Sequence, residues 1–102
     1  MSAPPFTLIY QPEAEKVLLD LYSKKQYATK FKKVRKTLRL LEQAGPRHPG
    51  LRSHAYQSVP APDGGTLWES YVENHTPSAW RIWWFYGPDE EQITIVTIGP
   101  HP

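Results

Sequence analysis

The sequence predicts an α+β fold in which a hairpin of two antiparallel helices packs on one face of a mainly antiparallel, twisted sheet. Two observations lead to this prediction. Apolar residues in the first half recur with the 3.6-residue period of helices, and the second half contains short runs rich in aromatic and β-branched residues between turn sequences. The expected element order is β-α-α-β-β-β-β, within a single domain over residues 1–102.

Two helices are expected after a short strand at 6–10. Pro12 occupies a position that is favoured at the start of a helix, and acidic residues follow it. The second helix, 27–43, has an apolar residue every three or four positions and is stopped by Gly45. Because few residues separate the two helices, they are expected to form an antiparallel hairpin.

Four strands are expected in the second half, over 51–59, 67–73, 80–86 and 92–98. Clusters of Pro, Gly, Asn and Asp between them mark the loops. The strand 80–86 is apolar on both faces, which is typical of a strand in the centre of a sheet.

Arg81 lies inside this aromatic strand and is the only Lys or Arg after Arg52. An unpaired buried cation costs several kcal/mol, so Arg81 must either pair with a carboxylate or face a site that requires positive charge. Hairpin lengths predict that Tyr71 lies opposite Arg81 on one neighbouring strand and Thr97 on the other.

Alternation along the central strand separates its two faces. The uncharged set is expected against the helices and consists of Trp80, Ile82, Trp84 and Tyr86. Arg81 is then expected on the open, concave face, beside Trp83. Glu69 and Glu73 are expected on the same face, and an ion pair with either of them is the structural alternative to a functional role for Arg81.

Charge is unevenly distributed along the chain. Residues 1–55 contain eleven Lys or Arg and four Asp or Glu, whereas residues 56–102 contain one Arg and six acidic residues. The basic half indicates either a polyanionic or acidic partner or a solvated helix face. Disulfides and thiolate chemistry are excluded because the chain has no cysteine.

No membrane span and no metal site are expected. The apolar runs are all shorter than the roughly 20 residues of a membrane helix, and a cytoplasmic location is therefore expected. The four histidines lack the spacing of known metal-binding motifs.

Three parts of the sequence resemble the RelE/ParE superfamily of toxins from type II toxin–antitoxin pairs, and the RelE/YoeB-like mRNA interferases most closely. They are residues 10–14, residues 48–54, and residues 80–84 together with 98–101. The resemblance covers nearly the whole chain. It implies a ribosome-dependent endoribonuclease that cuts mRNA by attack of the ribose 2′-OH on the adjacent phosphate, without a metal or cofactor. It also implies a cognate antitoxin as protein partner.

The resemblance also implies catalytic roles for particular residues. Arg81 and His101 match the central-strand arginine and the C-terminal histidine of the YoeB type. The glutamate base of that type has no counterpart, because Pro49-Gly50-Leu51 stands in its place. In our hypothesis Arg81 binds the phosphate through its planar fork and His101 is the general acid. His54 is the expected base, with Glu69 or Tyr71 as alternatives.

The RNA is expected to contact basic and aromatic side chains. Arg47 and Arg52 would hold the RNA backbone, and an exposed Trp83 or Trp68 would stack on a base. The basic second helix is expected either to bind ribosomal RNA or to be a solvated face. The full set of expected RNA-binding residues is Arg47, Arg52, Tyr71, Trp83, Lys32, Lys33 and Lys36.

Two other functions remain as alternatives. One is a ParE-like toxin that inhibits DNA gyrase and performs no RNA chemistry, and the other is a non-catalytic fold relative that acts as a protein-binding module. The presence of both Arg81 and His101 favours the nuclease over the gyrase inhibitor. The acidic second half favours the binding module, because an RNA-cleaving face is usually more basic.

Overall fold

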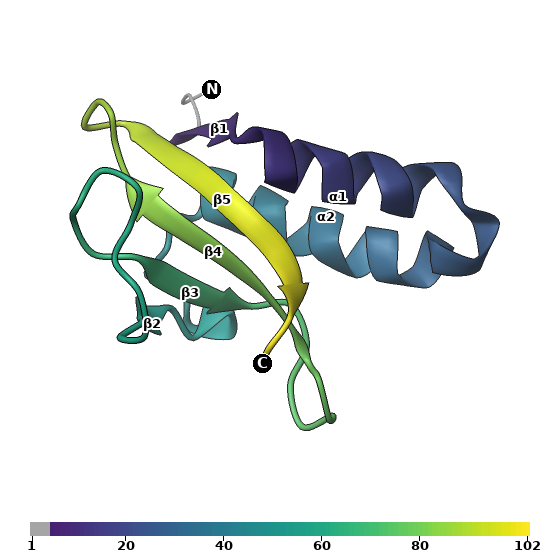
Figure 1. The fold of residues 1–102 in the computed structure, drawn as a ribbon. Coiled ribbons are helices and arrows are strands. Elements are labelled where there is room, and N and C mark those ends of the chain that lie inside the picture. The colour runs from purple at the N-terminus through teal and green to yellow at the C-terminus, as the bar shows by residue number, and fades with distance from the viewer. Residues whose placement is uncertain (1–4) are drawn as a thin grey trace.

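The computed structural model describes residues 5–102, which form a helical layer and a five-stranded sheet (Figure 1). The first four residues of the expected 1–102 domain lie outside the described residues. In chain order the elements are β1 (Thr7–Tyr10), α1 (Pro12–Ser23), the 3₁₀ turn η1 (Lys25–Tyr27), α2 (Ala28–Gln43), the 3₁₀ turn η2 (Pro49–Leu51), β2 (His54–Ala55), β3 (Trp68–Tyr71), β4 (Trp80–Tyr86) and β5 (Gln92–Pro100). The expected α+β fold and element order are therefore confirmed. No helix in residues 5–102 is long and apolar enough to cross a membrane.

The strands lie in the order β1-β5-β4-β3-β2, with β1 parallel to β5 and the other pairs antiparallel. Both helices lie on one side of this sheet, as Figure 1 shows. β4 has a paired strand on each side, as its apolar faces predicted. Its position brings side chains from β2, β3 and the end of β5 close to it.

The pairing predicted around Arg81 is confirmed on one side only. On β3, Tyr71 lies opposite Arg81, as expected. On β5 the prediction of Thr97 is wrong, because Gly99 pairs with Arg81.

Two one-residue shifts account for this difference. The β4–β5 hairpin closes with Tyr86 opposite Ile93, one residue later than expected. A β-bulge then adds a second residue on β5, opposite the step from Trp83 to Trp84. A single shift would exchange the two faces of the strand, but two shifts leave them as predicted.

The two faces of β4 contribute to two apolar clusters. Ile82 and Trp84 are buried in the main core between sheet and helices, with Trp80 packed against it, as alternation predicted. On the other face, residues 56–67 fold back over the sheet. The second cluster consists of Trp83, Phe85, Ala61 and Leu67. The prediction of an exposed Trp83 is therefore wrong, since only 7% of it is accessible.

Trp68, the alternative stacking residue, does not lie on the open face. Its ring stacks on Trp84, with 5.8 Å between the ring centroids, and packs against the main core. Neither tryptophan is therefore presented on the open face as an exposed platform for a base.

The strand expected at 51–59 is present only at His54 and Ala55. Leu51 is instead buried at the end of a 3₁₀ turn, and Arg52 adopts a left-handed conformation with φ of 48°. This conformation is uncommon for a residue with a side chain and is incompatible with strand pairing. The turn directs the chain so that His54 pairs with Glu69 across β2 and β3.

Glu73 does not lie on the face that alternation predicted. Its carboxylate accepts hydrogen bonds from Lys30 Nζ at 2.7 Å, Lys33 Nζ at 3.1 Å and the Trp80 backbone N–H at 3.1 Å. The cause is an irregularity after β3, where the N–H groups of Val72 and Glu73 both donate to the Trp80 carbonyl. Burial alone would raise the pKa of the Glu73 carboxyl, but these hydrogen bonds together lower it to about 2.

Candidate functional site

A buried carboxylate, that of Glu69, lies on the open face of the sheet with 2% of the residue accessible. Three basic side chains surround it. The distances are 2.9 Å from His54 Nε2 to Oε1, 3.5 Å from His101 Nε2 to Oε2, and 3.8 Å from Arg81 Nε to Oε1. The structure thus brings together all three residues that were expected to be catalytic. We call these four residues the Glu69 cluster.

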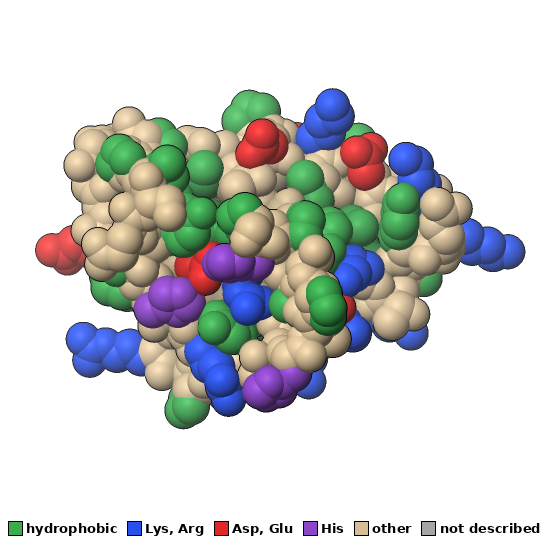
Figure 2. Space-filling view, turned by 60° about the horizontal axis from the view of Figure 1, so that its bottom comes forward, with side chains coloured by type: hydrophobic (Ala, Val, Ile, Leu, Met, Phe, Trp, Pro, Cys, Tyr) green, Lys and Arg blue, Asp and Glu red, His purple; other side chains and the backbone are tan. Residues whose placement is uncertain are grey.

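The cluster is assembled from four neighbouring parts of the sheet. His54 comes from β2, Glu69 from β3 and Arg81 from β4, and His101 follows the end of β5. The His101 backbone N–H donates to the Ala79 carbonyl at 2.9 Å, which holds the end of the chain beside β4. Figure 2 shows histidine, basic and acidic side chains gathered on this side of the molecule.

Arg81 is held in place mainly by backbone groups. Its Nη1 donates to the carbonyls of Glu73 and Trp80, and its guanidinium carbon lies 3.6 Å from the centre of the Tyr71 ring. Its Nε makes no hydrogen bond, and the contact with Glu69 at 3.8 Å is longer than a hydrogen bond. The ion pair that was the alternative explanation is present with Glu69 but is loose, and the Glu73 carboxylate is engaged by lysines.

His54 is fixed at both ring nitrogens. Its Nδ1 lies 2.9 Å from the Arg52 carbonyl, and its Nε2 contacts Glu69. A carbonyl can only accept, so Nδ1 must carry a proton. The side chain is nevertheless 48% exposed. It is therefore both oriented and accessible, as a group that exchanges protons with a substrate must be.

His101 has a similar environment. Its Nδ1 lies 3.0 Å from the Pro102 carbonyl oxygen, its Nε2 faces Glu69, and its side chain is 43% exposed. Both imidazoles thus cover the same buried carboxylate and present their outer faces to solvent.

Two of the expected RNA-binding residues border the cluster. The Tyr71 ring lies between Arg81, at 3.6 Å, and the exposed Arg52, whose guanidinium carbon is 5.9 Å from the ring centre. The His54 ring meets the edge of Tyr71 with 5.8 Å between centroids. Tyr71 therefore packs between the exposed Arg52 and Arg81, whose side chain is only 10% accessible.

The other expected RNA-binding cations lie elsewhere. Lys32, Lys33 and Lys36 are on α2, in the helical layer, and Lys33 pairs with Glu73. Lys32 and Lys36 line a separate hollow of about 530 Å³ on the surface of the helices. Arg47 is exposed in the turn between α2 and η2. The basic helix is consequently separated from the Glu69 cluster by the sheet.

A larger hollow of about 790 Å³ extends from α1 past the end of β5 to the loop between β2 and β3. Its lining is mostly apolar and includes Tyr56, Leu67, Trp83, Val96, Gly99 and Pro100. Gly99 and Pro100 directly precede His101, so the hollow adjoins the cluster. Trp83, although buried from water, forms part of this wall.

Sequence reasoning named Glu69 only as a rival partner of Arg81 or an alternative base. Alternation placed it on the correct face, but its position between two histidines depends on how β2 and the end of β5 are arranged.

In the described part of the chain, no group of three His, Cys, Asp or Glu side chains has an arrangement that could hold a metal ion.

Solved structures of YoeB, YoeB/ParE and RelE proteins share this fold, as the sequence resemblance implied. The chain is similar to the YoeB dimer subunit from Staphylococcus aureus, with a TM-score of 0.67 and 12% identity over 96% of this chain and 99% of that one. It is also similar to a YoeB/ParE toxin from Agrobacterium tumefaciens, with a TM-score of 0.69 and 9% identity over 95% and 100% of the two chains. A third similar structure is that of the archaeal RelE–RelB complex from Pyrococcus horikoshii OT3, with a TM-score of 0.63, 12% identity and 94% coverage of each chain.

No protein-family model matches the sequence, and no curated protein is significantly similar to it. Identities this low establish the fold alone.

Proposed function

We propose that this protein is the toxin of a type II toxin–antitoxin pair and a ribosome-dependent, metal-free mRNA endoribonuclease that acts in the cytoplasm. The observation that carries the proposal is the convergence of His54, His101 and Arg81 on one carboxylate at the open face of the sheet. The fold, shared with YoeB and RelE, is consistent with this activity.

Cleavage by the ribose 2′-OH needs a base, an acid and a cation near the phosphate. In the proposed reaction His54 accepts the proton of the 2′-OH at Nε2 as the O2′–P bond forms, because its Nδ1 already carries a proton. The Glu69 carboxylate beside Nε2 stabilises the imidazolium that results. His101 donates a proton to the 5′-oxygen as the P–O5′ bond breaks, which leaves a 2′,3′-cyclic phosphate and a 5′-hydroxyl. Arg81 stabilises the additional negative charge on the phosphorane through its fixed guanidinium.

The surroundings of the cluster support contact with RNA. Arg52 and Tyr71 lie beside Arg81, where they can bind the phosphates next to the scissile one. The adjoining hollow of about 790 Å³ has an apolar and aromatic lining suited to a nucleobase. Lys32 and Lys36, on the other layer, are proposed to contact ribosomal RNA instead of the substrate.

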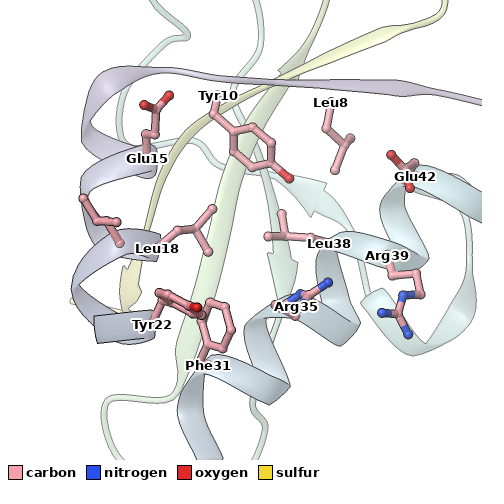
Figure 3. Close-up of a pocket in the computed structure, with 11 residues that line it drawn as sticks. Leu8, Tyr10, Glu15, Leu18, Tyr22, Phe31, Arg35, Leu38, Arg39 and Glu42 are labelled. Atoms are coloured by element: carbon pink, nitrogen blue, oxygen red, sulfur yellow. The ribbon is translucent and has the colours of Figure 1, made fainter. Parts of the chain in front are cut away.

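The proposed antitoxin partner has a candidate binding surface on the helices. Figure 3 shows a hollow between α1, α2 and β1, of about 440 Å³, in which Tyr22 and Phe31 lie at one end and Arg35 and Arg39 on one side. Leu19 and Tyr22 on its border are 65% and 72% exposed. An amphipathic antitoxin segment with acidic residues along one edge would match both its apolar and basic parts. The structurally similar archaeal RelE was solved as a complex with RelB.

The test is a cleavage assay with purified ribosomes and a defined mRNA. We expect cuts within the message only when ribosomes are present, and a fall in the cleavage rate of about 10²-fold or more in Arg81→Ala and His101→Ala. Growth arrest on expression should be lost in both variants. His75→Asn serves as the control, since His75 is exposed with a positive φ that Asn tolerates.

Two results would contradict the proposal. One is full cleavage and toxicity in both variants when circular dichroism shows that they are folded. The other is an absence of cleavage by the unaltered protein. Inhibition of DNA gyrase in a supercoiling assay would then support the ParE-like alternative.

A further inference from the structure

We propose that Glu69 is a positioning residue that orients His54 with its carboxylate. The inference rests on the proposed nuclease function for its catalytic meaning, but not for its geometry. The carboxylate comes from β3, in the middle of the open face.

The two carboxylate oxygens differ in their contacts. Oε1 is 2.9 Å from His54 Nε2, whereas Oε2 is 3.5 Å from His101 Nε2 and makes no hydrogen bond. His54 also has its Nδ1 at the Arg52 carbonyl, at 2.9 Å. The carbonyl can only accept, so it fixes the tautomer of His54 with a proton on Nδ1, and the carboxylate fixes the direction of Nε2. A carboxylate that orients an imidazole is a known way to prepare it for proton transfer.

Burial separates the role of Glu69 from those of the histidines. The Glu69 side chain is 2% exposed, whereas those of His54 and His101 are about half exposed. A substrate on this face therefore meets the imidazoles, and Glu69 acts through them. A buried carboxylate is costly unless it is paired, and an apolar side chain opposite Trp83 would fill the same place without that cost. A purely structural role does not explain a glutamate here.

Neutralisation of Arg81 is the competing explanation for Glu69. The Arg81 guanidinium is already anchored by its Nη1 to two backbone carbonyls and packed on the Tyr71 ring. Its Nε lies 3.8 Å from Glu69 without a hydrogen bond. The orientation of Arg81 therefore does not depend on Glu69, whereas that of His54 does.

The test compares the unaltered protein with Glu69→Gln, which keeps the size of the side chain and removes its charge. NMR contacts between ring protons report the orientation of His54 relative to Tyr71, whose ring centroid lies 5.8 Å from that of His54. In the unaltered protein we expect such contacts between the two rings. In Glu69→Gln we expect them to weaken, because the His54 ring is no longer held by the carboxylate, and cleavage to slow by at least about 10-fold with KM unchanged. Glu90→Gln, at an exposed turn, controls for the loss of one negative charge.

The possible results have separate meanings. Unchanged contacts between the His54 and Tyr71 rings in Glu69→Gln would overturn the inference, because the carboxylate would then not orient His54. Weakened contacts in a protein that does not cut mRNA would support the inference and reject the proposed function. If Glu69→Gln does not fold, Glu69→Asp keeps the charge but withdraws the carboxylate by one methylene. A folded Glu69→Asp with the His54 ring unchanged would also overturn the inference.

Discussion

Replacing Glu73 with Gln is expected to lower the free energy of unfolding by about 2 kcal/mol at pH 7. Glu73 joins the β3–β4 hairpin to α2 through Lys30 and Lys33, and it also accepts a hydrogen bond from the Trp80 backbone. Lys30 lies 5.1 Å from the centre of the Trp80 ring, so the same contacts position the beginning of β4. The substitution keeps the side-chain shape and removes the charge.

The magnitude follows from the pKa of the Glu73 carboxyl. A pKa lowered from 4.5 to about 2 corresponds to about 3 kcal/mol, at 1.36 kcal/mol for each pH unit. Because Lys33 is half exposed and its charge is screened by solvent, we reduce this to about 2 kcal/mol. For a chain of this length that loss corresponds to a decrease in Tm of about 8 °C.

The pH dependence has a definite sign. The folded protein has the lower pKa, so between about pH 4.5 and pH 2 the unfolded chain binds the proton more readily. The contribution of Glu73 is therefore complete above pH 4.5 and is lost as the pH falls toward 2. Urea unfolding at several pH values should show the two proteins far apart at pH 7 and close together at pH 2. Subtracting the variant from the unaltered protein removes the effects of the other carboxylates.

Two outcomes would refute this reasoning. One is a free energy of unfolding of Glu73→Gln at pH 7 within about 0.5 kcal/mol of the value for the unaltered protein, which is the usual range for surface substitutions. The other is a pair of stability curves that run parallel from pH 7 to pH 2. Glu90→Gln is the matched control, because Glu90 is exposed and should show neither effect.

Two further predictions concern the core and the helical surface. Trp84→Phe removes the indole N–H that donates to Ser70 Oγ at 2.8 Å, and it leaves a cavity in the core. We therefore expect the free energy of unfolding in urea titrations to fall by at least about 2 kcal/mol. A loss below about 0.5 kcal/mol would contradict the packing described. Leu19→Glu places a negative charge on the border of the proposed antitoxin groove. It should weaken binding of the proposed antitoxin by at least about 10-fold in calorimetry, with Tm unchanged. Unaltered affinity would show that the antitoxin binds elsewhere.

The sequence was most informative where a local pattern determines the structure. The strand 80–86 has the same bounds in the structure because an apolar run between turns leaves few alternatives. Alternation also placed Arg81 and Glu69 on a common face, even though the pairing with β5 was wrong, because two shifts in register cancel.

Features that depend on long-range contacts were not predictable. Nothing local indicates that Arg52 adopts a positive φ or that the loop after β2 covers Trp83. The side-chain direction of Glu73 follows from one irregular residue after β3 and from lysines about 40 positions earlier in the chain. For the same reason, the meeting of Glu69 with both histidines requires the arrangement of four strands. Residue types identified the chemistry of the site, but only the fold identified its central residue.

The β-bulge in β5 determines which side of the sheet receives the last histidine. Val96 is the extra residue, since Ile95 pairs with Trp84 and Thr97 with Trp83. With it, Gly99 lies opposite Arg81, and His101, two positions further on, projects to the same side. If Val96 paired with Trp83 instead of bulging, Ile98 would lie opposite Arg81. Pro100 would then follow on that side and the His101 ring would turn toward the helices, with no change in the residues of the site. The bulge at Val96, five positions before His101, therefore decides whether the second imidazole of the site is in place.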